Sequence, residues 1–235
     1  MNFAGLFLSI FCLFGCQKQE KTLHFATCAD YPPFEYYENG EIKGFDIDLA
    51  HAVAEILHKK AHFSNMQFSA IFPSLNNENV DAGISTVTMT KKRQEMFDFS
   101  DPYYIESLAL VFLKTDPIAH PSRLKEVACQ LGTTMQIWLE THTPEVRILP
   151  MDSNNQAIET LKAGHVRGVF MDSPQAKAFT KNNPALGYVF IAQSDAGYSI
   201  VLRKGSPLKD SINQALKQLK KNGKLDFLKK KWFKE

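Results

Sequence analysis

The sequence predicts an α/β fold of two lobes in which helices cover mainly parallel β-sheets. Extended and helical segments alternate along the chain, and its 235 residues exceed the length of a typical single domain. Two long apolar segments without helical spacing, 105–113 and 190–202, bracket one block of this alternation. We therefore expect two lobes joined by two extended crossings.

In the first half of the chain, helical spacing and turn residues mark the expected elements. Leu49, Val53 and Ile56 recur at helical spacing after Asp46, whose acidic side chain suits the first turn of a helix. Pro32 holds Tyr31 extended at the end of the first strand. The expected elements are a strand at 22–27, a hairpin turn at 38–41, a helix from 46, a helix at 69–76, a strand at 81–86 and a helix capped by Thr90.

The second half repeats the alternation. Ser153 is an N-cap candidate, and Gly164 suits the residue that ends the same helix. Asp172 and Pro174 suit the start of the next helix. The expected elements are a strand at 127–131, a helix opened by 132–134 and reaching about 141, a helix from 153 to 164, a strand at 166–171, and two terminal helices at 207–222 and 224–233.

The N-terminal sixteen residues carry no charge and are too short a run to span a bilayer, which is typical of a secretory signal. Leu13-Phe14-Gly15-Cys16 resembles a bacterial lipobox, which implies cleavage before Cys16 and a lipid on its thiol. We expect a signal peptide at 1–15 and a polar tether at 16–21. A plain buried N-terminal helix is the alternative.

Charge and cysteine content restrict the partners. The 27 basic and 25 acidic residues nearly balance, so nothing favours a nucleic-acid partner. No metal-ligand spacing is present, and we expect no cofactor. Cys28 and Cys129 each lie in a strand-like run, and we expect two buried thiols instead of a disulfide.

Polar and aromatic side chains gather where the expected strands end, which is where open α/β sheets bind ligands. Arg93 offers a planar fork for a carboxylate, and Thr134 begins a helix with free N–H groups. Asp172 suits an ammonium group. Taken singly, Arg93 is also consistent with a surface arginine, Thr134 with an ordinary helix start and Asp172 with a helix cap. Together the three residues resemble a receptor for a zwitterion. The candidate residues are Tyr31, Phe68, Ser85, Thr86, Thr88, Arg93, Thr134 and Asp172.

Nine motifs in order resemble the family 3 bacterial extracellular solute-binding proteins, which serve amino-acid ABC importers. They lie at 26–35 (ATCADYPPFE), 44–49 (GFDIDL), 72–75 (FPSL), 81–83 (DAG), 90–93 (TKKR), 99–104 (FSDPYY), 132–134 (GTT), 168–172 (GVFMD) and 222–224 (NGK). The resemblance implies that the lobes close on a ligand. It places lobe 1 at 22–104 plus 198–235, lobe 2 at 109–189, and the hinge at 105–108 and 190–197.

The resemblance also implies a role for each candidate residue. Arg93, Thr88 and Thr134 would bind the carboxylate of an amino acid, and Asp172 the α-ammonium, helped by Ser85 or Thr86. Tyr31 and Phe68 would flank its side chain. We expect a monomer in the periplasm, anchored to a membrane through Cys16, that delivers its ligand to an ABC permease in the inner membrane.

One position departs from the pattern. Members that bind basic amino acids often carry an acid where this chain has Cys28, while 64–65 and 168–170 look most like arginine-binding members. We expect a basic amino acid, with Glu35, Asp30 or Asp195 replacing that acid. Glutamine or another polar amino acid, a periplasmic dehydratase-like enzyme and a sensor without a transporter are the alternatives.

Overall fold

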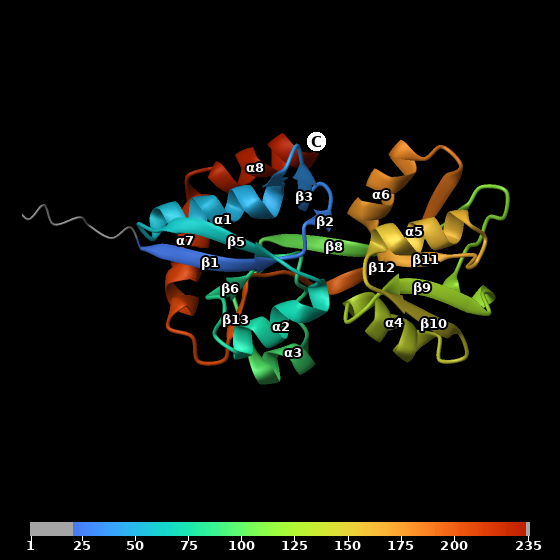
Figure 1. The fold of residues 1–235 in the computed structure, drawn as a ribbon, viewed down its shortest axis with the longest axis horizontal. Helices are drawn as coiled ribbons and strands as arrows, with labels where there is room; N and C mark the ends of the chain where they lie inside the picture. The colour runs from blue at the N-terminus through green and yellow to red at the C-terminus, as the bar shows by residue number, and fades with distance from the viewer. Residues whose placement is uncertain (1–20, 234–235) are drawn as a thin grey trace, which may run out of the picture.

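The computed structural model describes residues 21–233, which fold into two α/β lobes, each built on a five-stranded sheet (Figure 1). The expected signal peptide, the lipobox and Cys16 lie outside the described residues, as does all of the tether except Lys21. Among the described residues, no helix is long and apolar enough to cross a membrane.

The first sheet has the strand order β5-β1-β6-β13-β7. Its strands are β1 (Thr22–Thr27), β5 (Lys60–Asn65), β6 (Ala82–Gly83), β7 (Phe97–Phe99) and β13 (Val201–Arg203). Helices α1 (Phe45–Ile56), α7 (Leu208–Lys221) and α8 (Lys224–Phe233) cover one face, and α2 (Phe68–Asn76) and α3 (Lys91–Met96) the other (Figure 1). Successive side chains of β1 point to opposite faces of the sheet and belong to different cores: Phe25 packs on the α1 side and Ala26 on the α2 side.

The second sheet has the order β10-β9-β11-β8-β12. Its strands are β8 (Tyr104–Leu113), β9 (Glu126–Gln130), β10 (Arg147–Met151), β11 (Val169–Asp172) and β12 (Leu186–Tyr198). Helices α5 (Asn154–Lys162) and α6 (Ser173–Asn182) pack with one core and α4 (Thr134–His142) with the other. A 3-10 turn, η1 (Pro121–Arg123), precedes β9.

A third, small sheet joins β2 (Asp30–Tyr31), β3 (Glu35–Glu38) and β4 (Glu41–Lys43) next to the first lobe. The turn between β3 and β4 is the predicted hairpin. Asn39 and Gly40 both have positive φ there, at 54° and 83°, which asparagine and glycine tolerate best.

Two connections between the lobes lie side by side. The chain enters the second sheet through β8 and leaves it through β12, and these strands pair antiparallel, with Tyr104 opposite Tyr198 and Ile105 opposite Gly197. The pairing shifts register between Phe190 and Ala192 and between Gln193 and Gly197. The expected hinge segments are therefore neighbouring parts of one strand pair.

The structure differs from the sequence prediction in its strands. Each sheet is parallel on one side and antiparallel on the other, because β13, β8 and β12 run against their neighbours. Only Ala82–Gly83 of the strand expected at 81–86 is a strand, and the strand expected from 166 begins at Val169. Cys28 and Cys129 are buried free thiols, as predicted.

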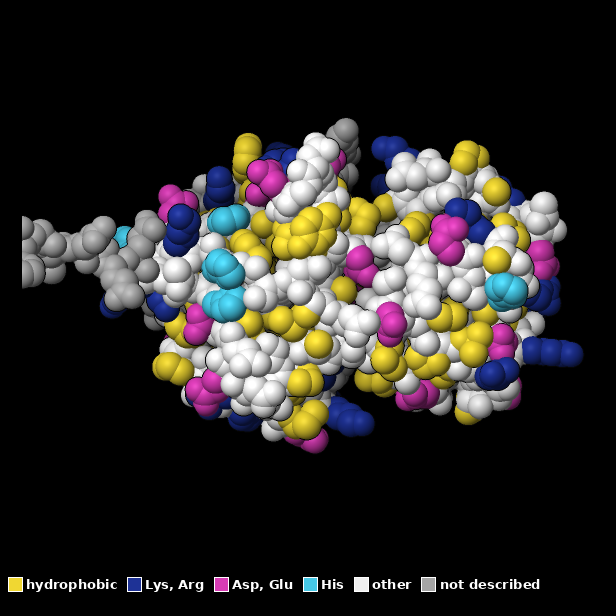
Figure 2. All heavy atoms as spheres, viewed as in Figure 1, with side chains coloured by type: hydrophobic (Ala, Val, Ile, Leu, Met, Phe, Trp, Pro, Cys, Tyr) yellow, Lys and Arg dark blue, Asp and Glu magenta, His cyan; other side chains and the backbone are white. Residues whose placement is uncertain are grey.

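Charge is mixed over the face of the molecule shown in Figure 2. On this face, lysine and arginine side chains alternate with aspartate and glutamate over both lobes. No group of three or more His, Cys, Asp or Glu side chains within residues 21–233 has the arrangement of a metal site. The mixed charges of the described residues on this face form no basic track of the kind that binds nucleic acid.

Candidate functional site

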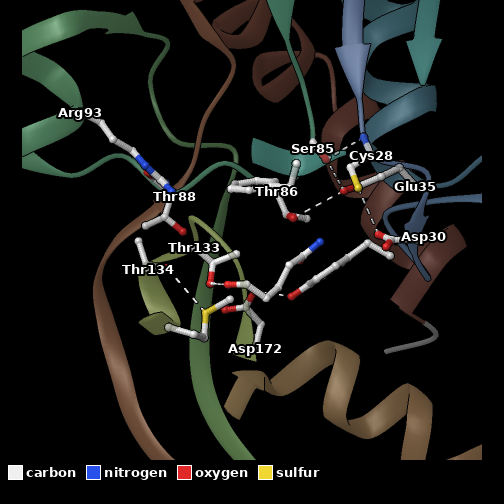
Figure 3. A pocket seen from close by; sticks show the side chains of 14 residues that line it. Cys28, Asp30, Glu35, Ser85, Thr86, Thr88, Arg93, Thr133, Thr134 and Asp172 are labelled. Carbon is white, nitrogen blue, oxygen red and sulfur yellow. Dashed lines mark hydrogen bonds between the residues drawn. The ribbon is translucent and has the colours of Figure 1, made fainter. Parts of the chain in front are cut away.

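A pocket lies between the two sheets, and all eight candidate residues line it (Figure 3). Six further residues complete its wall: Cys28, Asp30, Glu35, Gln130, Thr133 and Met135. Residues before Gln130 come from the first lobe and its small sheet, and those from Gln130 onward belong to the second lobe. The structure thus brings the predicted residues together; their part in binding a ligand stays a prediction.

Arg93 occupies one end of the pocket. Thr90 caps α3 by accepting a hydrogen bond from the Arg93 N–H at 3.2 Å, which fixes the first turn that carries the side chain. The guanidinium donates to the carbonyl oxygens of Thr88 (2.7 Å) and Gly132 (2.9 Å), and it lies over the rings of Phe68 and Phe72. Burial lowers the pKa of Arg93 to about 10, so the group remains a cation at neutral pH.

The start of α4 faces the same end. Thr133 is the N-cap residue and Thr134 the first helical residue, and the Thr133 hydroxyl donates to the Gln130 carbonyl at 2.7 Å instead of capping the helix. The first N–H groups of a helix have no partner within it, so they suit an anion. Arg93 and this helix start are therefore complementary to one carboxylate.

Asp172 ends β11 in the middle of the pocket (Figure 3). It stands at the N-cap position of α6, yet its side chain makes no capping bond and instead accepts a hydrogen bond from the Tyr31 hydroxyl of the other lobe. Burial raises the pKa of Asp172 to about 6, and Tyr31 and Arg93 oppose that rise. A carboxylate with this pKa is ionised at pH 7 and suits an ammonium group.

The end opposite Arg93 is acidic (Figure 3). The half-buried Asp30 accepts a hydrogen bond from the Cys28 thiol at 3.4 Å, and Glu35 is fully buried. Glu35 accepts from the hydroxyls of Ser85 at 2.9 Å and Thr86 at 3.5 Å. Burial raises the pKa of both carboxyls and of the Cys28 thiol. Asp30 and Glu35 are the substitutes expected for the acid that Cys28 replaces; the Asp195 side chain is not described.

A second buried carboxyl, Asp46, lies behind Glu35. It lies in the first turn of α1, as predicted, and its fully buried side chain accepts hydrogen bonds from the Thr86 N–H and the Tyr103 hydroxyl, both at 2.8 Å. Thr86 has a positive φ of 48°, so this loop conformation depends on such bonds. Burial raises the pKa of Asp46 to about 7, and its charge contributes to the raised pKa of Glu35.

Three wall positions differ in detail from the sequence prediction. Phe68 begins α2, one residue before the helix expected at 69–76, and Gln130 and Met135 were not predicted. Gln130 ends β9, so the strand-end rule that indicated Asp172 points to it as well.

Comparisons with known proteins identify the family of this chain. The family model "Bacterial extracellular solute-binding proteins, family 3" matches residues 23–235. Arginine-binding extracellular protein ArtP of Bacillus subtilis (strain 168) is 34% identical over 226 residues, 93% of this chain and 89% of that protein.

Two solved structures of an ancestral arginine-binding protein are similar as well. The structure bound to arginine has a TM-score of 0.87 at 37% identity and covers 91% of this chain and 99% of its own. The structure bound to glutamine has a TM-score of 0.87 at 38% identity and covers 92% and 99%. The fold, the pocket between two lobes and the family match together show that this chain belongs to the bacterial extracellular solute-binding proteins, family 3.

Proposed function

We propose that this protein captures a basic L-amino acid between its lobes and delivers it to an ABC permease. The observation that carries the proposal is the placement of Asp30 and Glu35 at the end of the pocket opposite Arg93. A ligand that spans the pocket meets a cation at one end and carboxyls at the other. An amino acid with a charged guanidinium or ammonium in its side chain matches that order.

The α-carboxylate would lie between Arg93 and the start of α4, with Thr88 beside it, and the α-ammonium against Asp172. Ser85 and Thr86 add hydroxyls near the ammonium, and Tyr31 and Phe68 flank the side chain. Burying either charge unpaired costs several kcal/mol, so a zwitterion needs partners for both ends. Arg93 is the buried cation of the pocket wall, and Asp172 is a buried carboxyl of the same wall.

The charge of the wall supports a ligand with a net positive charge. Asp30, Glu35 and Asp172 bring three carboxyls against the single guanidinium of Arg93. A zwitterion pairs with Arg93 and Asp172 and leaves Asp30 and Glu35 without a cation. A second cation on the ligand would balance them and lower the pKa of both carboxyls.

A neutral polar amino acid such as glutamine is the second candidate, and Glu35 also favours it. Because burial and Asp46 raise the pKa of Glu35, a protonated Glu35 is able to donate to an amide oxygen. The two candidates require opposite protonation states of the same carboxyl and are separable by experiment.

The architecture supports capture by closure, with 105–108 and 190–197 as the hinge, lobe 1 at 22–104 plus 198–235 and lobe 2 at 109–189. We also infer a periplasmic monomer that is anchored through Cys16 and has no catalytic activity. Turnover of a prephenate-like acid that Asp172→Asn abolishes would instead support the dehydratase alternative.

The test is calorimetric titration of the common amino acids into a soluble form that begins after Cys16, unfolded and refolded to remove carried ligand. Arginine or lysine should bind, and Glu35→Gln should weaken them by about tenfold or more, because a cation loses its partner. The matched control is Glu38→Gln, on the same strand but exposed and paired with Lys43.

Each outcome is distinct. Tight binding of glutamine that Glu35→Gln leaves intact would select the second candidate. Equal loss in Glu35→Gln and Glu38→Gln would remove Glu35 from the side-chain subsite. Absence of binding across the whole panel would overturn the amino-acid proposal.

A further inference from the structure

Glu106 is a buried carboxyl that does not line the pocket and that the family motifs do not include. It lies on β8 where the strand connects the lobes and is 2% exposed. Its Oε1 accepts a hydrogen bond from the Thr88 hydroxyl at 3.0 Å. Its Oε2 is buried without a hydrogen-bond partner of normal geometry among the described residues, with Ser194 as a polar neighbour. Glu106 therefore lies directly behind a wall residue of the carboxylate end.

The direction of the Thr88–Glu106 bond decides what Thr88 offers a ligand. A threonine hydroxyl has one proton. While Glu106 is ionised, that proton points to Oε1 and the Thr88 oxygen presents only lone pairs to the pocket, which repel a carboxylate. When Glu106 is protonated, its O–H donates to the Thr88 oxygen, and the Thr88 proton is free to donate to a ligand carboxylate.

We propose that Glu106 is the positioning residue of the carboxylate subsite: a bound α-carboxylate holds Glu106 protonated, Thr88 turns its proton to the ligand, and capture takes up one proton from solvent. The inference rests on the proposed function, because it assumes an amino acid whose carboxylate lies at Arg93 and Thr88.

The negative charge of a bound carboxylate favours protonated Glu106, as the hydrogen bond between Glu106 and Thr88 does. The groups that face Glu106 are Arg93 from α3, Asp172 from β11 and Tyr198 from β12. Arg93 is the cation that compensates both Glu106 and an incoming carboxylate, so the two anions compete for it. Burial and the charge of Asp172 already raise the pKa of Glu106 to about 7, so a further anion acts on a group that exchanges protons at neutral pH.

The proposal predicts a pH profile and a variant that removes it. The contribution of Glu106 to affinity, measured as the difference between wild type and Glu106→Gln, should fall as pH rises from 6 to 8.5, by about tenfold for each unit by which the ligand raises the pKa of Glu106. Glutamine has the shape of protonated glutamate and an N–H₂ that donates to Thr88. Glu106→Gln should therefore bind at pH 8.5 at least as tightly as wild type at pH 6, because its profile lacks this fall.

The experiment is calorimetric titration of arginine at pH 6, 7, 8 and 8.5, in buffers of different ionisation heat, into wild type, Glu106→Gln and a matched control. The control is Glu126→Gln, on β9 of the same sheet, whose carboxylate pairs with Arg147 at 2.9 Å away from the pocket. The titration of the ligand and of Asp30, Glu35 and Asp172 is common to all three proteins. The difference in protons taken up therefore reports on Glu106.

A Glu106→Gln variant that binds more weakly at every pH, with the wild-type slope, would overturn the proposal and leave a purely structural role. If the variant does not fold, carboxyl carbon NMR of the wild-type chain still decides. A pKa of Glu106 that rises when arginine binds supports the inference, and an unchanged or lower pKa overturns it. If arginine binds but either of these results contradicts the role of Glu106, the proposed function still stands. If no amino acid binds, the proposed function and the role of Glu106 are both overturned.

Discussion

Arg93 combines three features at the scale of one residue: a buried cation, a cap that fixes its helix turn, and bonds to two carbonyl oxygens. The carbonyl bonds keep the guanidinium in place without neutralising it, because carbonyl oxygens carry only partial charge. The full charge is therefore available to a carboxylate.

Replacing Arg93 tests this role. Arg93→Ala should weaken amino-acid binding by about 3–5 kcal/mol, by analogy with removing one partner of a buried ion pair. That is about a hundredfold to a thousandfold or more in affinity by calorimetry. Lys92→Ala, one residue away on the exposed side of α3, should change affinity by less than about twofold. A loss below about tenfold for Arg93→Ala would show that another group binds the carboxylate.

The sequence predicted those site residues that lie at a strand end or a helix start, because their position does not depend on the order of strands in the sheet. Arg93, Thr134 and Asp172 were indicated because strand ends and helix starts are local features, and the pocket brings them together. Asp46 and Glu106 were not indicated as buried groups. Asp46 is the first-turn acid that the sequence indicated, and Glu106 lies within an apolar run. The burial of each carboxyl depends on which loop packs against it, which the sequence does not reveal.

At the scale of an element, the β8–β12 pair fixes how the lobes are placed. Gly197 lies in this pair opposite Ile105, where a Cβ would come within 2.4 Å of the Tyr104 carbonyl oxygen. A backbone atom in a paired strand has little freedom to move, so a side chain at position 197 would push the strands apart.

Gly197→Ala should therefore destabilise the protein by about 2 kcal/mol and weaken ligand binding, since both lobes must meet the ligand. Urea unfolding and calorimetry measure the two effects. Gly187→Ala is the matched control on the same strand, because its Cβ would meet the ring of Phe112, at 2.8 Å, which is a side chain able to shift. Equal effects of the two variants on affinity would show that the strand pair at 197 does not govern closure.

Elements with strong local signals were predicted, and those without were not. The caps at Thr90 and Ser153 and the periodic apolar residues of α1 and α7 marked helices close to their observed ends. Strands β5 and β10 were missed because both are only partly buried, β5 has few apolar residues, and β10 contains a proline, which is unfavourable inside a strand. Antiparallel pairing of β8 and β12 is set by contacts distant in sequence, which no local pattern reveals.

At the scale of the whole molecule, carboxyls that are costly to ionise lie in the wall of the pocket and directly behind it. Burial is the first cause of the raised pKa of Glu35, Asp46, Glu106 and Asp172, which reaches about 7 for Asp46 and Glu106 and about 6 for Asp172. A binding protein needs charged groups fixed in position to pair with the charges of its ligand. Buried carboxyls of this kind reduce the stability of the fold when they are ionised.

Stability should therefore fall as pH rises. A carboxyl whose pKa is higher in the folded than in the unfolded chain binds more protons when folded, so its contribution is present below the unfolded pKa and is lost as pH rises through the folded pKa. For these groups the window runs from about pH 4 to about pH 7. Between pH 5 and pH 8 we expect a loss of at least about 2 kcal/mol in the free energy of unfolding, which is roughly what a single carboxyl with a folded pKa of about 7 contributes.

Urea unfolding at pH 5, 6, 7 and 8 measures this loss, and the corresponding fall in Tm is about 4–8 °C. Asp46→Asn should flatten the profile, because asparagine cannot ionise, while Asp98→Asn, near the surface lysines 204 and 209, should not. A free energy of unfolding that rises from pH 5 to pH 8 would mean that these carboxyls are ionised at little cost, so the fold would then compensate their charge without a ligand.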